Sequence, residues 1–332
     1  MSPRPGPLNL ITDVAGLALG NASDARVRTG VSVLLCPGGW TAAVDVRGGG
    51  PATRETEVLG LENLVGKVDA IVLSGGSVFG LGAADAVTAW LSSKGVGLRF
   101  SPASPAIPIV CAASLHDLGN GGDKAFGREP PYRTLGFEAA AAAQTLFTLG
   151  PVGAGLGAQA GSTRGGLGSA SLDLGDGTVV GALAAVNPVG SVFCDDGQTF
   201  LAWPYEQGDE FGGRIPPGAR LAPDPLPPHS RLNPSAQPAP GGATTLCVVA
   251  VNLDLSRAEC RRVAMMAQDG LARAVRPAHT PFDGDLVFCI ARGADIGQGA
   301  DRNRRVTEVG AACADTLARA IARGVYETLL QA

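Results

Sequence analysis

The sequence predicts an α+β protein, built as a layered sandwich with sheet inside and helices outside. Short apolar runs bounded by Gly and Pro, which are typical of buried strands, recur along the 332-residue chain. Longer segments with apolar residues at helical spacing stand before and after these groups of strands. Because a sheet face and a helix stripe must each be covered by another element, such layers are the expected solution.

The first half of the chain alternates between expected strands and expected helices. We expect the strands at residues 31–36, 42–46 and 70–73, with an irregular, proline-broken strand within 101–113. We expect the helices at 82–93, with Gly95 beyond its end as a stop signal, and at 136–149, a run rich in alanine.

The second half begins with a Gly-rich stretch, residues 153–170, and continues with strands and two long helices. The expected strands lie at 171–174, 178–185, 246–251 and 285–291, the first two forming a hairpin around Gly175-Asp176-Gly177. The expected helices lie at 257–275 and 303–328, and the second has Val306, Val309, Cys313, Leu317 and Ile321 on one face.

Residues 206–243 differ in composition from the rest of the chain. Nine of the 24 prolines fall between Pro216 and Pro240, with few apolar residues among them. Such a segment predicts a surface linker or a disordered stretch. We therefore expect a single domain, residues 1–332, that contains this linker.

Composition and charge argue against several classes of partner. A formal net charge of −4 and a pI near 5.4, without a basic cluster, argue against nucleic-acid binding. The apolar stretches are interrupted well short of a membrane span, and the N-terminus lacks the apolar core of a secretory signal. Seven scattered cysteines without a C-x-x-C pair predict buried thiols in a reducing cytoplasm, with no structural zinc site.

The junction at the end of the linker places two threonines directly before an apolar strand. It reads GGATTLCVVA over residues 241–250. One interpretation is strand propensity, because Thr is β-branched and fits a pleated surface. The other is a cleavage site at which one threonine becomes a new N-terminus. The pattern alone does not choose between Thr244 and Thr245.

Common catalytic and cofactor motifs are absent. Only three histidines occur, and Gly75-Gly76-Ser77-Val78-Phe79 lacks the last glycine of the G-x-S-x-G nucleophile elbow. There is no Walker sequence, and the run 153–161 lacks the preceding strand and following acidic residue of a dinucleotide site. We expect glycine-mediated packing or a backbone-lined pocket there, and no cofactor.

Two carboxylates stand two residues apart in Phe282-Asp283-Gly284-Asp285, just before an expected strand. They lie on the same side of the chain if the extended conformation reaches back that far. A solvated turn is one alternative, and a metal site is another, although no further cluster of acidic residues or histidines supplies ligands. The third interpretation is a carboxylate pair that holds an ammonium group.

A new N-terminal threonine would need no histidine for catalysis. Its hydroxyl can attack the preceding carbonyl and shift the acyl group from nitrogen to oxygen, and hydrolysis of that ester frees the α-amine. An α-amine titrates near ~7.7–8 and can serve as the base for the hydroxyl beside it. Asp283 and Asp285 are the acceptors available to orient this amine.

Five longer motifs together resemble the DmpA-type L-aminopeptidase/D-esterase family of self-cleaving N-terminal-nucleophile hydrolases. They are SLHDLGNGGDKAFGREPPYRTLGF, GAGLGAQAGSTRGGLGSAS, VGALAAVNPVGSV, GGATTLCVVAVN and MAQDGLARAVRPAHTPFDGD. Among them, NGGDKAFG and RPAHTPFDGD are most similar to the nylon-oligomer hydrolase branch of this family. The likeness runs from about Asn9 to the C-terminus and is weakest across the linker.

The resemblance implies a four-layer αββα sandwich that cuts itself into residues 1–243 and 244–332. It implies that Thr244 is the nucleophile, that Asp283 and Asp285 assist it, and that Asn187 helps to form the oxyanion hole. Without the resemblance, Asn187 would be interpreted as a turn residue before a proline.

Several positions are open to more than one interpretation. Ala243 stands where relatives on this branch commonly carry Asn; cleavage stays possible because the hydroxyl attacks, but a slower reaction is one expectation. Arg164 replaces a common Lys and, because it cannot act as a tunable amine, is given a positioning or anion-holding role. His116 replaces an aromatic residue and either contacts the oxyanion or packs. Ser74 and Ser77 either line the pocket or cap a helix.

The function predicted from the sequence is that of a cytoplasmic amide hydrolase that acts on small peptides or ω-amino-acid amides. Members of the family are homo-oligomers, often tetramers, which implies the same assembly here, with residues 120–124 holding a loop near a subunit contact. Two alternatives stay open. One is an acyltransferase of the ornithine acetyltransferase type, which resembles this sandwich, and the other is a binding protein that never cleaves.

Overall fold

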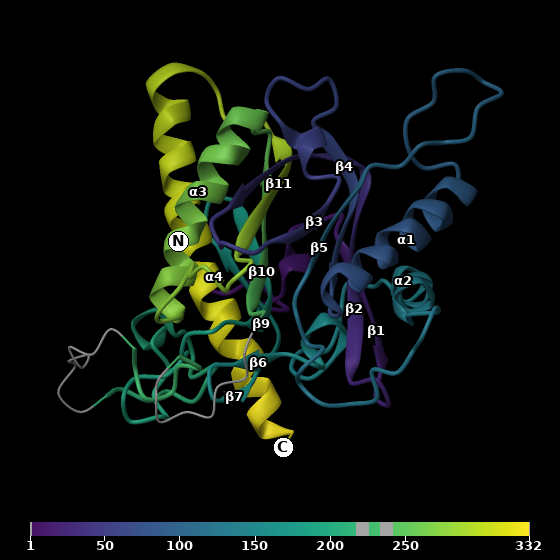
Figure 1. Ribbon diagram of the computed structural model, residues 1–332. Helices are drawn as coiled ribbons and strands as arrows, with labels where there is room; N and C mark the ends of the chain where they lie inside the picture. The colour runs from purple at the N-terminus through teal and green to yellow at the C-terminus, as the bar shows by residue number, and fades with distance from the viewer. Residues whose placement is uncertain (1, 217–225, 233–241, 332) are drawn as a thin grey trace.

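The computed structural model describes residues 2–216, 226–232 and 242–331 (Figure 1). These residues form a main sheet in the order β3-β5-β4-β2-β11-β10-β9-β8, with β1 paired to β2, and a small sheet of β6 and β7. The strands are β1 (Ala18–Asp24), β2 (Thr29–Val46), β3 (Ala52–Arg54), β4 (Lys67–Ser74), β5 (Val110–Ser114), β6 (Gln159–Ala160), β7 (Thr163–Arg164), β8 (Gly166–Asp173), β9 (Val179–Asn187), β10 (Thr244–Leu253) and β11 (Leu286–Ala294). The helices are α1 (Gly82–Ser93), α2 (Tyr132–Ala141), α3 (Arg257–Ala274) and α4 (Gly299–Leu330).

The long strand β2 joins two layers of the sheet. Its first part pairs with β1 and β4, and its last part, Thr41–Val46, pairs with β11. The pairing with β4 shifts register between Leu35 and Trp40, at the sequence Pro37-Gly38-Gly39. The sequence predicted two strands separated by this tripeptide. The structure has one strand instead, because pairing resumes at Trp40 after the irregularity.

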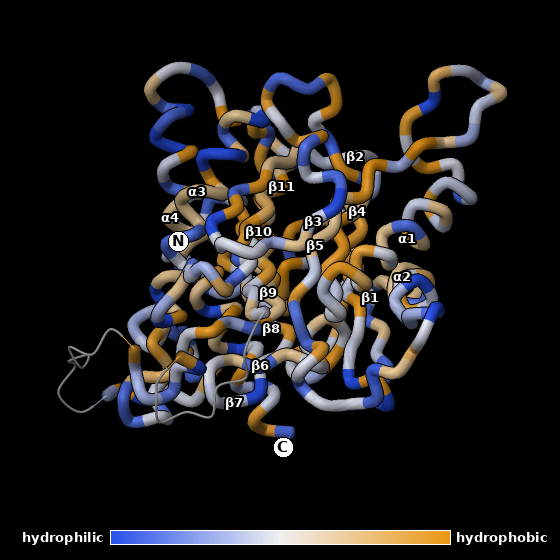
Figure 2. The backbone as a smooth tube through the Cα atoms, viewed as in Figure 1, coloured by the Kyte–Doolittle hydropathy of each residue, from blue (hydrophilic) through white to orange (hydrophobic). Residues whose placement is uncertain are grey.

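Three apolar cores separate four layers. Because successive side chains of a strand face opposite sides, each central strand contributes to two cores. In β10, Leu246, Val248 and Ala250 belong to the core between the two sheet layers, whereas Cys247, Val249 and Val251 face α3 and α4. The tube in Figure 2 shows the hydrophobic residues gathered along these strands, between the helical layers.

The third core lies between the other sheet layer and α1 and α2. It joins Ala83 and Val87 of α1 and Leu135 of α2 to Val31 of β2 and Val72 of β4. Figure 1 shows α3 and α4 on one side of the strands and α1 and α2 on the other. The predicted order of layers, helix–sheet–sheet–helix, is confirmed.

Most of the predicted helices are confirmed within a few residues, and their ends have local causes. Helix α1 has the predicted bounds. Helix α3 begins after Ser256, whose hydroxyl accepts a hydrogen bond from the Glu259 amide, a capping box of the type that favours this start. The face of α4 predicted from its apolar spacing is buried.

The alanine-rich helix is displaced from its predicted position. It was expected at 136–149, but α2 ends at Ala141. Beyond this point Gln144 forms a β-bridge with Leu19, and Gly150 forms one with Leu167. Tertiary pairing with β1 and β8 therefore overrides the helix propensity of the alanines.

The proline-rich linker is only partly at the surface. Phe211 is buried, and so are Ser230 and Arg231 in the short described segment 226–232. The expected linker is therefore packed against the body at these residues. The stretches 217–225 and 233–241, which belong to the same predicted linker, lie outside the described residues.

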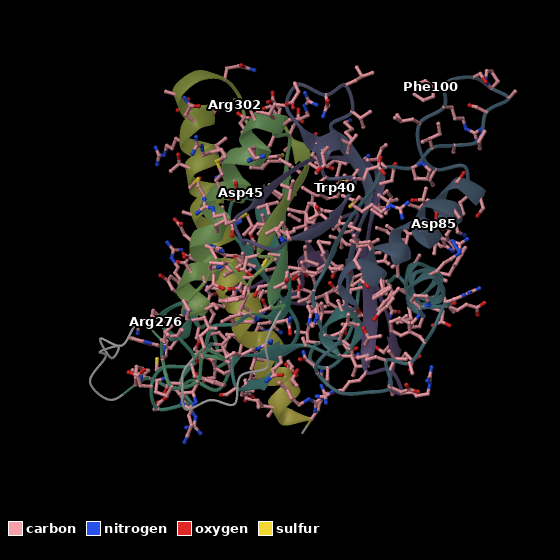
Figure 3. The ribbon with its side chains drawn as sticks, in the orientation of Figure 1. Trp40, Asp45, Asp85, Phe100, Arg276 and Arg302 are labelled. Carbon is pink, nitrogen blue, oxygen red and sulfur yellow. The ribbon has the colours of Figure 1, made fainter. Side chains whose placement is uncertain are left out.

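The predicted burial of the cysteines is confirmed. All seven cysteines are free and buried. Trp40 is buried within the sheet layers, whereas Phe100 lies on a projecting loop, 81% exposed (Figure 3). No helix in the described parts of the chain is long and apolar enough to cross a membrane.

Candidate active site

The peptide bond between Ala243 and Thr244 lies at the start of β10, held between two neighbouring strand ends. The Ala243 amide donates to the carbonyl of Phe282 at 3.2 Å, and the Gly284 amide donates to the carbonyl of Ala243 at 2.8 Å. Thr244 is paired with Asn187 of β9 in the antiparallel ladder. The segment before β11 and the end of β9 thus position this bond on two sides.

The two threonines of the junction differ in what their side chains contact. The Thr244 hydroxyl donates to the carbonyl of Ala243 at 2.5 Å, which brings it next to the bond that would be cut. The Thr245 hydroxyl is buried without a hydrogen-bond partner among the described residues. The geometry therefore favours Thr244 as the nucleophile, a choice that the sequence pattern left open.

The two predicted carboxylates lie beside the junction and are fully buried. Asp285 accepts a hydrogen bond from the Thr245 amide at 2.8 Å and from the His279 amide at 2.9 Å. Asp283 accepts from the Val189 amide at 3.0 Å, and from the Thr280 hydroxyl at 2.5 Å. The interpretation as a solvated turn is therefore wrong, because both carboxylates are buried and accept hydrogen bonds.

Burial raises the pKa of Asp283 to about 6, and the neighbouring charge of Asp285 acts in the same direction. The hydrogen bonds from Thr280 and Val189 oppose this shift because they stabilise the carboxylate. Asp283 is therefore mainly ionised at neutral pH. Its carboxylate is thus available to hold an ammonium group at the junction.

A loop of three glycines, Gly48–Gly50, holds the carboxylate segment in place. The Gly50 amide donates to the Asp283 carbonyl at 2.8 Å, and the Gly48 amide donates to the Asp285 carbonyl at 3.0 Å. A Cβ atom at Gly48 would lie 2.3 Å from the Asp285 nitrogen, so no larger residue fits. The repeated glycines are the sequence signal for this contact, and sequence reasoning did not use it.

Asn187 is buried, and three donors converge on its side-chain oxygen. They are the Gln159 amide at 2.8 Å, the Arg231 guanidinium at 3.1 Å and the Asn120 side chain at 3.3 Å. Its nitrogen donates to the carbonyl of His116 at 3.1 Å. In the uncut chain this nitrogen is therefore bound to His116, and the Ala243 carbonyl is bound to Gly284.

The guanidinium at the site comes from Arg231 and was missed by the sequence analysis. Arg231 lies in the segment that the sequence analysis expected to be a surface linker, so no buried role was considered for it. Arg164, the predicted anion-holding residue, is half-buried in β7, and its side chain makes no hydrogen bond or ion pair with another described residue. Its strand partner Gln159 is the residue whose amide contacts Asn187.

His116 lies against the residues before the scissile bond. A Cβ atom at Gly242 would be 2.2 Å from the imidazole carbon Cγ, so the glycine is needed for the chain to pass the ring. His279 places its Nδ1 3.1 Å from the Asp285 carboxylate. His116 therefore packs against the chain next to the junction, and His279 contacts the carboxylate of Asp285.

The turn Ser74–Ser77 lies near the site, but neither serine contacts Thr244. The Ser74 hydroxyl donates to the Gly75 carbonyl, and the Ser77 amide donates to the carbonyl of Leu115, two residues from Asp117. Asp117 in turn accepts from the Gly76 amide at 2.9 Å. No hydrogen bond among the described residues joins either serine hydroxyl to Thr244.

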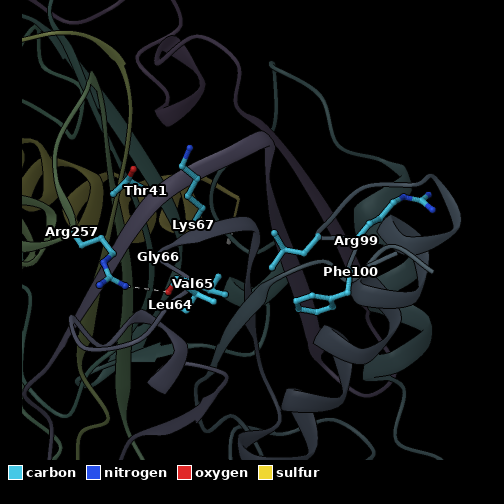
Figure 4. Close-up of a pocket in the computed structure, with 9 residues that line it drawn as sticks. Thr41, Leu64, Val65, Gly66, Lys67, Arg99, Phe100 and Arg257 are labelled. Carbon is cyan, nitrogen blue, oxygen red and sulfur yellow. Dashed lines mark hydrogen bonds between the residues drawn. The ribbon is translucent and has the colours of Figure 1, made fainter. Parts of the chain in front are cut away.

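An open pocket of about 480 Å³ lies elsewhere, and none of the candidate residues line it (Figure 4). It is lined by Thr41, Leu64, Val65, Gly66, Lys67, Leu98, Arg99, Phe100 and Arg257. Thr41 pairs with Ala291, five residues along β11 from the Leu286 that adjoins the junction. At ~3.3 Å per residue the two places are ~16 Å apart along the sheet.

The described residues contain no group of three or more His, Cys, Asp or Glu arranged to hold a metal ion.

Known proteins match this chain over most of its length. A family model described as peptidase family S58 matches residues 9–329. An uncharacterized aminopeptidase of Mycobacterium tuberculosis is 42% identical over 340 residues, covering 96% of this chain and 94% of the relative. A 6-aminohexanoate-oligomer endohydrolase of Kocuria sp. is 28% identical over 292 residues, covering 84% of this chain and 73% of the relative.

Solved structures share the fold. A β-aminopeptidase of Burkholderia sp. has a TM-score of 0.69 at 23% identity, covering 97% of this chain and 87% of the other. An L-aminopeptidase D-Ala-esterase/amidase of Ochrobactrum anthropi has a TM-score of 0.68 at 20% identity, covering 98% and 87%. The chain thus shares the fold of the Ochrobactrum protein, which is described as a variant of the N-terminal-nucleophile hydrolase fold.

Proposed function

This chain belongs to peptidase family S58 and hydrolyses amide or peptide bonds, and we propose that it does so through Thr244 after cutting itself between Ala243 and Thr244. The observation that carries the proposal is the contact of the Thr244 hydroxyl with the Ala243 carbonyl at 2.5 Å. The same carbonyl accepts from the Gly284 amide at 2.8 Å, a donor suited to the oxyanion that forms during the attack.

The closed site of the uncut chain supports maturation before turnover. Ala243 is 1% exposed, Thr244 is 3% exposed, and both carboxylates are buried. A substrate carbonyl can reach the Thr244 hydroxyl only if Gly242 and Ala243 leave. Cleavage provides this release, since it leaves Ala243 as the end of one fragment and Thr244 as the start of the other.

In the cut protein, Thr244 supplies both the nucleophile and its base. Its α-amine takes the proton of its hydroxyl as the oxygen attacks the substrate carbonyl, and it passes this proton to the departing amine. Asp283 and Asp285 hold the amine in place, and Asn187 and the Gly284 amide donate to the oxyanion. An ester to Thr244 results, and water then releases the acid.

The proposed substrates are small peptides or ω-amino-acid amides, in line with the activities that the names of its relatives state. We extend the proposal to a homotetramer in the cytoplasm, as the family resemblance implies. The seven free, buried cysteines are consistent with a reducing compartment.

N-terminal sequencing with intact-mass analysis of the purified protein tests the proposal. The expected result is two fragments of 243 and 89 residues, the second beginning Thr-Thr-Leu. A preparation that hydrolyses amides while consisting of one unbroken chain would disprove self-cleavage at this bond.

A further inference from the structure

Arg231 carries a buried positive charge beside the proposed site and takes no part in the mechanism proposed for Thr244. Its side chain is 6% exposed. Burial lowers its pKa to about 10, with Asp283 acting in the opposite direction, so the guanidinium stays charged at neutral pH. A buried charge is costly unless it is paired or bound by polar groups, so its contacts indicate what it does.

The segment that carries Arg231 is fixed by its main chain. The Arg231 amide donates to the Val189 carbonyl at 2.9 Å, and the Ser162 amide donates to the His229 carbonyl at 2.9 Å. These bonds lie in the part of the chain before the scissile bond and do not involve Gly242 or Ala243. Cleavage between Ala243 and Thr244 would therefore break neither of these bonds.

The guanidinium is directed at the amide of Asn187. It donates to the Asn187 side-chain oxygen at 3.1 Å and also to the main-chain carbonyl of Gln159. A charge-assisted hydrogen bond is roughly twice as strong as a neutral one. Arg231 is the charged donor among the three that converge on this oxygen, the others being the Gln159 amide and Asn120.

This arrangement determines which end of the Asn187 amide faces the reaction. An arginine side chain has donors only, so it binds the oxygen of the amide and turns the nitrogen away from itself. The nitrogen then points to the side of the His116 carbonyl, where His116 adjoins Gly242. An oxyanion needs a donor, and a rotated amide would present an acceptor instead.

We propose that Arg231 is a positioning residue that acts through Asn187, fixing its amide with the nitrogen available to the oxyanion. The inference rests on the proposed role of Asn187 in turnover. The contact between Arg231 and Asn187 is already present in the uncut chain, whereas the turnover that it serves requires cleavage. The side chains of Asp283, Asp285, His279 and His116 make no hydrogen bond to the Asn187 amide, and His116 contacts it only through its main-chain carbonyl.

A double-mutant cycle on the full chain tests the coupling, with L-alanine p-nitroanilide or, if it is hydrolysed better, 6-aminohexanoyl p-nitroanilide as the probe. Arg231→Met is expected to lower kcat by ~10- to 100-fold with KM changed less than about threefold. Asn187→Ala should lower kcat by ~10²–10³-fold. Adding Arg231→Met to Asn187→Ala should then cost less than about threefold more, because the amide that Arg231 orients is gone.

Two further variants keep the test decisive. Arg231→Lys retains a charged donor and should recover most of the lost kcat, which also serves if Arg231→Met folds poorly. Arg262→Met removes an exposed arginine of α3 and should match the wild type. Losses that multiply in the double variant would overturn the coupling to Asn187. Intact mass is recorded for each variant, so a failure of self-cleavage is seen separately from a failure of the cycle.

Discussion

The two ends of the sheet formed by β2, β11 and β10 differ in what fills them. At the end near Thr244 and Asp285, the chain itself occupies the space, and the polar groups are bound to each other. At the end near Thr41, an open pocket is lined by Leu64, which is 96% exposed, and by Phe100 (Figure 4). The proposed catalytic groups, Thr244, Asp283 and Asp285, are buried at the first end. The open pocket at the second end is lined by none of them.

If the chain cuts itself as proposed, this difference means that an open cavity is a poor guide to where the chemistry takes place. The charged residues around the open pocket are Lys67, Arg99 and Arg257, and Arg257 donates to carbonyls of the loop at 60–65. Gly242 and Ala243 cover Thr244 at the other end of the sheet, and in the proposed mechanism they occupy the place of a substrate.

The largest expected effect comes from removing the nucleophile. Thr244→Ala should abolish self-cleavage and lower turnover by at least about 10⁴-fold, because the remaining groups cannot form an ester. Thr245→Ala is the matched control, since its hydroxyl is buried without a partner and its loss removes no hydrogen bond. Intact mass and kcat are the measurements. Turnover retained by Thr244→Ala but lost by Thr245→Ala would transfer the role to the second threonine.

The pair of threonines also shows where sequence reasoning ends. The strand at β10 is a local feature, so the apolar run predicted it. The spacing of the two carboxylates left a solvated turn open, and only the family resemblance selected a catalytic role for them and the junction. Which threonine faces the carbonyl depends on the register of β10 against Asn187 in β9, and that register is set by pairing distant in sequence. The same limit explains α2, whose end is set by a bridge to Leu19.

Arg231 was missed for a different reason. Prolines predicted a solvated linker, and composition carries no information on where a single side chain is buried. The segment is instead held by Ser162 and Val189, residues that precede it by about 40 to 70 positions. By contrast, the role of Asn187 came from the family resemblance, and the local sequence alone favoured a turn.

Asn187→Ala sharpens the comparison at the reactive end. We expect kcat to fall by ~10²–10³-fold, while the Gly284 amide remains to bind the oxyanion. Asn120→Ala is the matched control, because Asn120 contacts the same amide oxygen at 3.3 Å without a charge, and its loss should cost less than about tenfold. Equal losses in the two variants would show that general packing of the loop, and not the amide, is responsible.

The dependence on pH tests the carboxylates with a smaller effect. Asp283, with a pKa of about 6, is ionised where an α-amine titrates, near ~7.7–8. Its charge favours the ammonium form and so raises the pKa of the amine, which must be neutral to act as a base. The logarithm of kcat/KM should therefore rise through pH 8 or above. In Asp283→Asn the midpoint should move down by about one pH unit, and an upward move would contradict the assignment.

The smallest effect is expected at the open end of the sheet. Phe100→Ser with Leu64→Ser replaces two exposed apolar side chains of the pocket, which none of the proposed catalytic residues line, and breaks no hydrogen bond of the site. Because surface substitutions away from buried contacts change little, kcat/KM should stay within about twofold and the two fragments should form as before. The measurement is kcat/KM at a fixed protein concentration, with the assembly followed by light scattering. Loss of turnover in a fully cut, undissociated protein would mean that the pocket, and not the end vacated by Ala243, receives the substrate.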